Sequence, residues 1–181
     1  MELSSFARHA VLSCRSVILG GSVITADPMF KGWNLEFGIS GEVAIFAGMH
    51  RDHQRWYSHR LSREMGINIY GNYGMPILAF PTSMGDEHEQ EGQGMVRTLG
   101  PYIEQGRIRF FSINGVQTDS FSNKGAHPFH RSWLQAQYDD YVASEVIPFI
   151  DSQCQSAGIA ITTYGASLGA YHAANTLFKH P

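Results

Sequence analysis

The sequence predicts an α/β fold in which a mostly parallel β-sheet is flanked by helices. Strand-like and helix-like segments alternate from residue 66 onward, as in parallel sheets with helical crossovers. One of them, Met75–Phe80, is a continuous apolar run, which is typical of a strand buried on both faces. Another, residues 158–163, leads through a glycine-rich G-x-S-x-G pattern into a helix-like segment.

The first half of the chain supplies the first strands. Residues 1–48 show no clear period, whereas 49–58 read as a first strand or as the approach to one. Residues 66–70 alternate apolar and polar side chains, which indicates a half-buried strand. A turn signal at 71–74 then precedes the apolar strand Met75–Phe80, which Pro81 ends.

Alternating loops, helices and strands follow. The expected elements are a polar loop over 82–94, a helix over 95–105, a strand over 108–113, a loop, a helix over 133–155, a strand over 158–163 and a helix over 168–178. Pro101 and Pro148 lie inside two of these helices, and we expect a kink or an interruption at each, because proline lacks the amide hydrogen that a helix uses.

Composition narrows the function classes. The 181 residues are 43% apolar and 16% charged, which suits one soluble globular domain. A net charge of −3 gives no reason to expect a nucleic-acid partner, and no apolar run is long enough to span a membrane. Cys14 and Cys154 make no disulfide framework, so we expect reduced thiols and a cytoplasmic protein. An apolar patch over 17–24 loosely resembles a secretory signal, but Gly-Gly-Ser breaks it.

The chemistry-bearing pattern is Gly165-Ala166-Ser167-Leu168-Gly169. A serine at a tight strand-to-helix turn is exposed and can act as a nucleophile, and Gly165 and Gly169 leave the room that such a turn needs. The amide of Leu168 would then face the developing oxyanion, helped by the helix N-terminus. In the competing interpretation the glycines only tighten a turn, and Ser167 caps the helix.

A second oxyanion donor is expected in the loop after the strand Met75–Phe80. The backbone N–H of Ser83 or of Met84 is the candidate, and an ordinary polar loop is the alternative. The acidic run 86–91 in the same loop reads as a solvated face, although a place at the mouth of a pocket is open to it.

Neither a metal nor another cofactor is expected. The pairs His50 and His53, and His127 and His130, have spacings that metal sites use, but no cysteine or carboxylate cluster accompanies them.

Taken together, residues 49–181 resemble the esterase D-like branch of the α/β-hydrolase superfamily. The stretches that carry the resemblance are 70–83, 106–111, 126–131, 137–142 and 165–173. The resemblance implies an α/β-hydrolase fold, a small-molecule ester as substrate, and Ser167 as the acylated nucleophile of a carboxylic-ester hydrolase. An acyltransferase on the same fold and a non-catalytic hydrolase-like binding module remain alternatives.

The chain departs from this branch at both ends. The catalytic acid and histidine of the family follow the region matched here, so we expect a fold truncated after the helix that follows Ser167, and a fragment inactive by itself. His172 and His180 lie on that helix, which leads away from the serine. Residues 1–48 have no counterpart, so we predict an N-terminal extension with Met49 as the natural start, followed by the front part of a hydrolase domain over 49–181. The strand before Ser167 would then expose an apolar edge.

Overall fold

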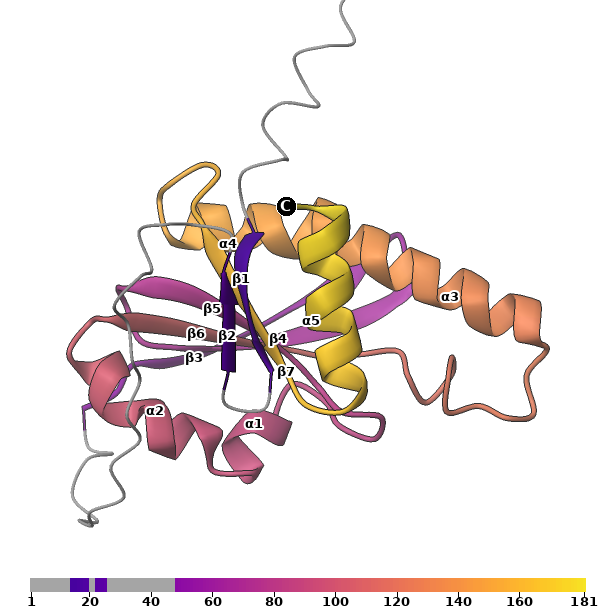
Figure 1. Ribbon diagram of the computed structural model, residues 1–181, viewed down its shortest axis with the longest axis horizontal. Helices are drawn as coiled ribbons and strands as arrows, with labels where there is room; N and C mark the ends of the chain where they lie inside the picture. The colour runs from indigo at the N-terminus through magenta and orange to yellow at the C-terminus, as the bar shows by residue number, and fades with distance from the viewer. Residues whose placement is uncertain (1–13, 20–21, 26–47) are drawn as a thin grey trace, which may run out of the picture.

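The computed structural model describes residues 14–19 and 22–25 as backbone and residues 48–181 with their side chains. They form one seven-stranded sheet with the order β2-β1-β7-β5-β6-β4-β3 (Figure 1). The strands are β1 (Cys14–Leu19), β2 (Ser22–Thr25), β3 (Arg51–Ser58), β4 (Arg63–Tyr70), β5 (Met75–Phe80), β6 (Ile108–Ile113) and β7 (Ile161–Gly165). The helices are α1 (Glu89–Gly92), α2 (Met95–Glu104), α3 (Pro128–Tyr141), the π-helical turn η4 (Val142–Val146), α4 (Ile147–Gln153) and α5 (Leu168–Lys179).

The sheet is parallel in its centre and antiparallel toward its edges. Strands β1, β7, β5 and β6 run parallel to one another, and for β5, β6 and β7 the alternation of strands and helices predicts this. The pairs β1–β2, β3–β4 and β4–β6 are antiparallel. For β3 and β4 the reason is the short connection over 59–62, which can join only antiparallel neighbours.

Strand β1 covers the outer edge of β7. Its pairing is parallel and places Val17 beside Thr163 and Ile18 beside Tyr164. The expectation that the strand before Ser167 has an open apolar edge is therefore wrong. Part of the predicted extension over 1–48 is built into the sheet, and residues 1–13, 20–21 and 26–47 lie outside the described residues, so Met49 as the natural start stays a prediction.

Two apolar layers cover the two faces of the sheet. Helix α2 covers one face and α3 to α5 cover the other (Figure 1). On β5, Leu78 and Phe80 pack in the cluster that contains α3 to α5, whereas Ile77 and Ala79 pack in the cluster that contains α2. All four side chains are at most 2% exposed. Burying a side chain the size of leucine or phenylalanine contributes about 1.5–3 kcal/mol, so this alternation fixes the register of the central strand.

Several boundaries differ from the sequence-based expectation. Helix α3 begins at Pro128 rather than at 133, because the ring of His127 accepts the N–H of Phe129 and proline suits the first helical turn. The interruption expected near Pro148 takes the form of η4, while Pro101 lies inside the continuous helix α2. Strand β7 begins after the expected 158, since Gly158 has a φ of 69° and belongs to a turn.

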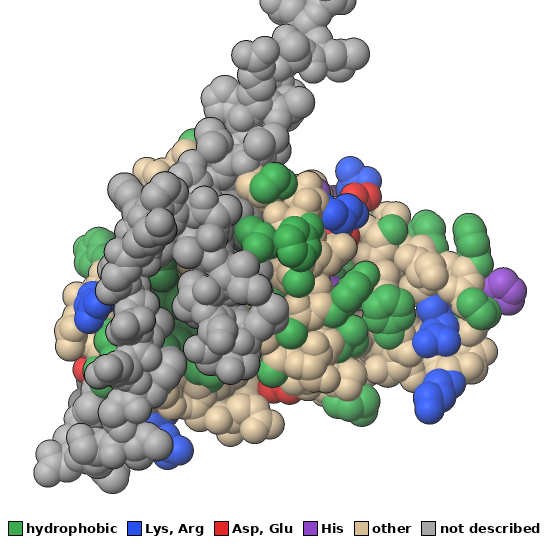
Figure 2. All heavy atoms as spheres, in the orientation of Figure 1, with side chains coloured by type: hydrophobic (Ala, Val, Ile, Leu, Met, Phe, Trp, Pro, Cys, Tyr) green, Lys and Arg blue, Asp and Glu red, His purple; other side chains and the backbone are tan. Residues whose placement is uncertain are grey.

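Apolar side chains gather over α5 and the outer part of α3 on one face of the molecule (Figure 2). The large exposed ones on these two helices are Phe129, Trp133, Tyr171 and Phe178. Among the described helices, none has the length and apolar character required to cross a membrane.

Candidate active site

Ser167 lies on a tight turn between the end of β7 at Gly165 and the start of α5 at Leu168. Its backbone has φ 54° and ψ −121°, a region that residues with a side chain rarely occupy. Such a conformation costs on the order of 1–3 kcal/mol and persists only where the surrounding structure enforces it. The side chain is exposed to solvent. The fold thus holds a serine hydroxyl outward at the carboxyl end of a central strand.

The two glycines of the pattern are required by space rather than by backbone torsion. A Cβ on Gly165 would lie 2.2 Å from the carbonyl carbon of Gly169, and a Cβ on Gly169 would lie 2.5 Å from the carbonyl oxygen of Phe80. Real Cβ atoms do not come this close to backbone. Strand β7, helix α5 and the end of β5 are therefore packed backbone to backbone around the turn.

Ser167 does not cap helix α5. Its side chain makes no capping hydrogen bond, and among the described residues none is hydrogen-bonded to Oγ. The first turn of α5 is closed by backbone groups instead, with the N–H of Gly169 donating to Ala166 and that of Ala170 donating to Ser167. The hydroxyl therefore has no structural partner in the described part of the chain.

The loop after β5 starts beside this turn, because Phe80 is paired with Gly165 in the sheet register. Within residues 48–181, the backbone N–H groups of Ser83, Met84 and Leu168 donate to no protein group. An oxyanion site needs free amides, and these three amides are the candidates that the sequence indicates.

Three side chains hold this loop in place. The Glu89 carboxylate accepts hydrogen bonds from the backbone N–H and the hydroxyl of Thr82. Gln117 Nε2 donates to the carbonyl oxygens of Thr82 at 2.7 Å and Gly85 at 3.3 Å. The Ser122 hydroxyl donates to the carbonyl of Ser83 at 3.3 Å. These contacts engage the amide and hydroxyl of Thr82 and the carbonyl groups of Thr82, Ser83 and Gly85, and they leave the amides of Ser83 and Met84 free.

The acidic run 86–91 is not a uniformly solvated face. Glu87 is buried, Glu89 anchors Thr82, and Glu91 pairs with Arg51 while accepting a hydrogen bond from the Tyr70 hydroxyl. The expectation of a solvated face is wrong for the buried Glu87, whereas Glu91 keeps 39% of its side chain exposed beside Arg51.

His172 faces the core instead of Ser167. Its ring is stacked on Phe80 with 6.0 Å between the ring centroids, and its Nε2 accepts a hydrogen bond from Gln135 Nε2 at 3.3 Å. Burial lowers the pKa of His172 to about 4, so the ring is neutral near pH 7. Among the described residues, no histidine or carboxylate is hydrogen-bonded to Ser167.

The side chains of His127 and His130 have separate environments. His127 caps α3, and the ring of His130 is stacked on Trp133. His53 contacts Glu87, which lies against His88.

No family model and no curated protein matches this sequence. Solved structures do match. A ferulic acid esterase shares 12% identity over 73% of this chain and 56% of its own, with a TM-score of 0.56. An S-formylglutathione hydrolase from Agrobacterium tumefaciens shares 16% identity over 79% of this chain and 57% of its own, with a TM-score of 0.52. The chain thus spans little more than half the length of these structures. The likeness shows the fold alone: over the matched part, the chain has the mixed α/β fold of these two structures, a sheet flanked by helices, as the sequence predicts.

Proposed function

We propose that this chain carries the nucleophile and the oxyanion-binding groups of a carboxylic-ester hydrolase, with Ser167 as the nucleophile. The observation that carries the proposal is the backbone of Ser167. Ser167 is exposed, its side chain makes no structural hydrogen bond, and its backbone is strained, so this conformation does not stabilise the fold. Strain of this kind is concentrated at functional sites. The esterase structures that share the fold support the same reaction class.

In the proposed reaction, the Ser167 oxygen attacks the carbonyl carbon of an ester and gives a tetrahedral intermediate. Its negative oxygen accepts hydrogen bonds from the amide of Leu168 and from that of Ser83 or Met84. Each such donor contributes about 2.7–4 kcal/mol to transition-state stabilisation. Collapse expels the alcohol and leaves an acyl-serine, which water then hydrolyses. The groups used are the serine, backbone amides, water and a base, so the proposal includes no cofactor.

The proton of the serine hydroxyl requires a base, and the described histidines do not provide one at Ser167. His172 is buried against Phe80, and His180 Nε2 lies 3.5 Å from Asp139 Oδ2. We therefore include in the proposal that this chain by itself hydrolyses esters no faster than background. The acid and the base would come from residues outside the described set.

The test is site-specific acylation or phosphonylation of Ser167. The chain is incubated with a fluorophosphonate, and the modified peptides are mapped by mass spectrometry. Ser156, another exposed serine, is the internal control. Slow modification at Ser167 and not at Ser156 is expected, because oxyanion donors retain some catalysis without the other catalytic groups. Added imidazole should accelerate the reaction at Ser167 by supplying a base.

Equal modification of Ser167 and Ser156, with or without imidazole, would contradict the proposed role. Turnover of p-nitrophenyl acetate that disappears in Ser167→Ala would keep the nucleophile and overturn the expected inactivity.

A further inference from the structure

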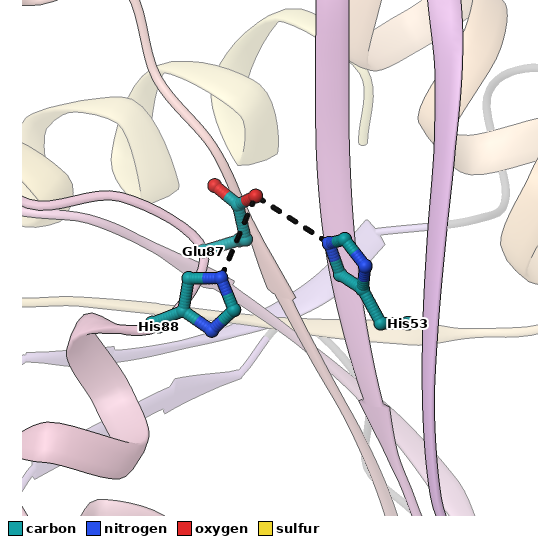
Figure 3. A group of neighbouring side chains, drawn as sticks. All are labelled: His53, Glu87 and His88. Carbon is teal, nitrogen blue, oxygen red and sulfur yellow. Dashed lines mark ion pairs between the residues drawn. The ribbon is translucent and has the colours of Figure 1, made fainter.

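A second group of polar side chains joins the outermost strand of the sheet to the loop that follows β5. His53 comes from β3, while Glu87 and His88 directly precede α1 (Figure 3). His53 Nε2 lies 3.5 Å from Glu87 Oε1, and His88 Nε2 lies 3.8 Å from the same oxygen. One ligand atom from each of the three residues lies within 4.8 Å of the others.

The carboxylate of this group is buried, and the contacts to its Oε1 are long. The Glu87 side chain is only 3% exposed, whereas those of His53 and His88 are 40% and 59% exposed. Arg55 also approaches Oε1, at 3.4 Å. A buried carboxylate is costly unless it is well paired, and normal N–H···O hydrogen bonds are about 2.7–3.2 Å. The nitrogen atoms of His53, His88 and Arg55 all lie farther from Oε1 than a normal hydrogen bond.

These spacings suit ligands around a metal ion. Metal–nitrogen and metal–oxygen bonds to zinc are about 2.0–2.2 Å, which places two ligand atoms of a tetrahedral site about 3.3–3.5 Å apart. We propose that His53, Glu87 and His88 form a binding site for a divalent first-row transition-metal ion. Two imidazoles and one carboxylate are a donor set that zinc accepts, with water at the fourth position.

Two neighbours adjust when the ion binds. Arg55 is a competing cation on Oε1, but its side chain is 56% exposed and can turn into solvent. Asn68 Nδ2 donates to the carbonyl of Glu87 at 2.9 Å and lies 3.0 Å from His88 Nδ1. This amide favours the His88 tautomer with its proton on Nε2. Coordination through Nε2 requires the proton on Nδ1, so the amide of Asn68 has to turn its oxygen toward the ring and give up its hydrogen bond to the Glu87 carbonyl.

The site is independent of the proposed ester chemistry, and its test is binding rather than activity. Zn²⁺ is titrated into the full chain by calorimetry, and Co²⁺ is followed by its visible absorption, which reports the coordination geometry. We expect saturable binding of one ion per chain and an increase in thermal stability with Zn²⁺ concentration.

Four variants make the test specific. His53→Ala and His88→Ala should each weaken Zn²⁺ binding at least about tenfold, since each removes a ligand. His59→Ala, which removes an exposed histidine next to β3, should leave binding unchanged. Arg55→Gln should strengthen binding several-fold, because it removes the competing cation from Glu87.

The site would be excluded if the wild-type chain bound no Zn²⁺, or if His53→Ala and His88→Ala bound it as tightly as His59→Ala. Weaker binding in Arg55→Gln would also overturn the arrangement, because Arg55 would then support the ion instead of competing with it.

Discussion

Replacing Ser167 by glycine should stabilise the protein, although it removes the proposed nucleophile. The serine is held at φ 54° and ψ −121°, where a Cβ is crowded by the backbone. The strain is on the order of 1–3 kcal/mol. Glycine lacks this strain, but the greater freedom of its unfolded chain cancels about 0.5–1 kcal/mol of the stability gained. We expect Ser167→Gly to be about 1 kcal/mol more stable than Ser167→Ala, which keeps the Cβ and loses only a hydroxyl without a hydrogen-bond partner.

Urea denaturation followed by circular dichroism measures this difference. For a chain of this size, 1 kcal/mol also corresponds to a shift in melting temperature of about 2–4 °C. The matched pair is Ser156→Gly and Ser156→Ala, at an exposed serine that is not among the residues with positive φ. There glycine should be the less stable of the two. If glycine were destabilising at Ser167 to the same degree as at Ser156, the turn would not be strained, and the argument for function from its backbone would fail.

Three further predictions concern the surroundings of this turn. Gly165→Ala should lower the free energy of unfolding by at least about 2 kcal/mol in urea denaturation, because its Cβ would meet the backbone of α5, whereas Gly92→Ala, with open space around it, should be tolerated. As the pH is lowered from about 6.5 to 4, the free energy of unfolding should fall by up to about 3 kcal/mol, because the pKa of His172 is about 4 in the folded chain and the unfolded chain binds the proton at a higher pH. Thermal melts at several pH values should lack this component in His172→Gln, and an unchanged pH profile in that variant would contradict the prediction. Glu89→Gln should speed hydrogen exchange at the Thr82 amide, measured by NMR, because a neutral amide accepts these bonds less strongly than a carboxylate; equal exchange rates would show that other contacts hold the loop.

The sequence predicts most of the central sheet because the information there is local. Met75–Phe80 is apolar enough to be identified as a buried strand, and the run before Ser167 is followed directly by its helix. His127-Pro128 carries the N-terminal signal of α3, whereas the apolar spacing alone predicts a start at 133. The partner of β7 could not be predicted in this way, since pairing with β1 depends on a segment at the other end of the chain.

The residues of the candidate sites also differ in whether local sequence predicts them. Ser167 and its glycines belong to one contiguous pattern, and the elbow-like turn follows from local crowding. The anchors Gln117 and Ser122 belong to no pattern, because they reach the loop only after the sheet and its connections have formed. The group of His53, Glu87 and His88 was missed for the same reason. Histidine spacing along the sequence does not show that Glu87 and His88, in the loop before α1, lie beside His53 on β3.

The pairing of β1 with β7 also has a consequence for the order in which the chain assembles. The two strands are about 150 residues apart in sequence, with Cys14 beside Ile161, so β1 leaves the ribosome long before its partner exists. Until β7 is made, β1 has only β2 to pair with among the strands beside it in the finished sheet. Closing so long a loop is slow, and unpaired strand edges promote aggregation in the meantime. Completion of this sheet is therefore a late event in folding, because it cannot precede the synthesis of β7.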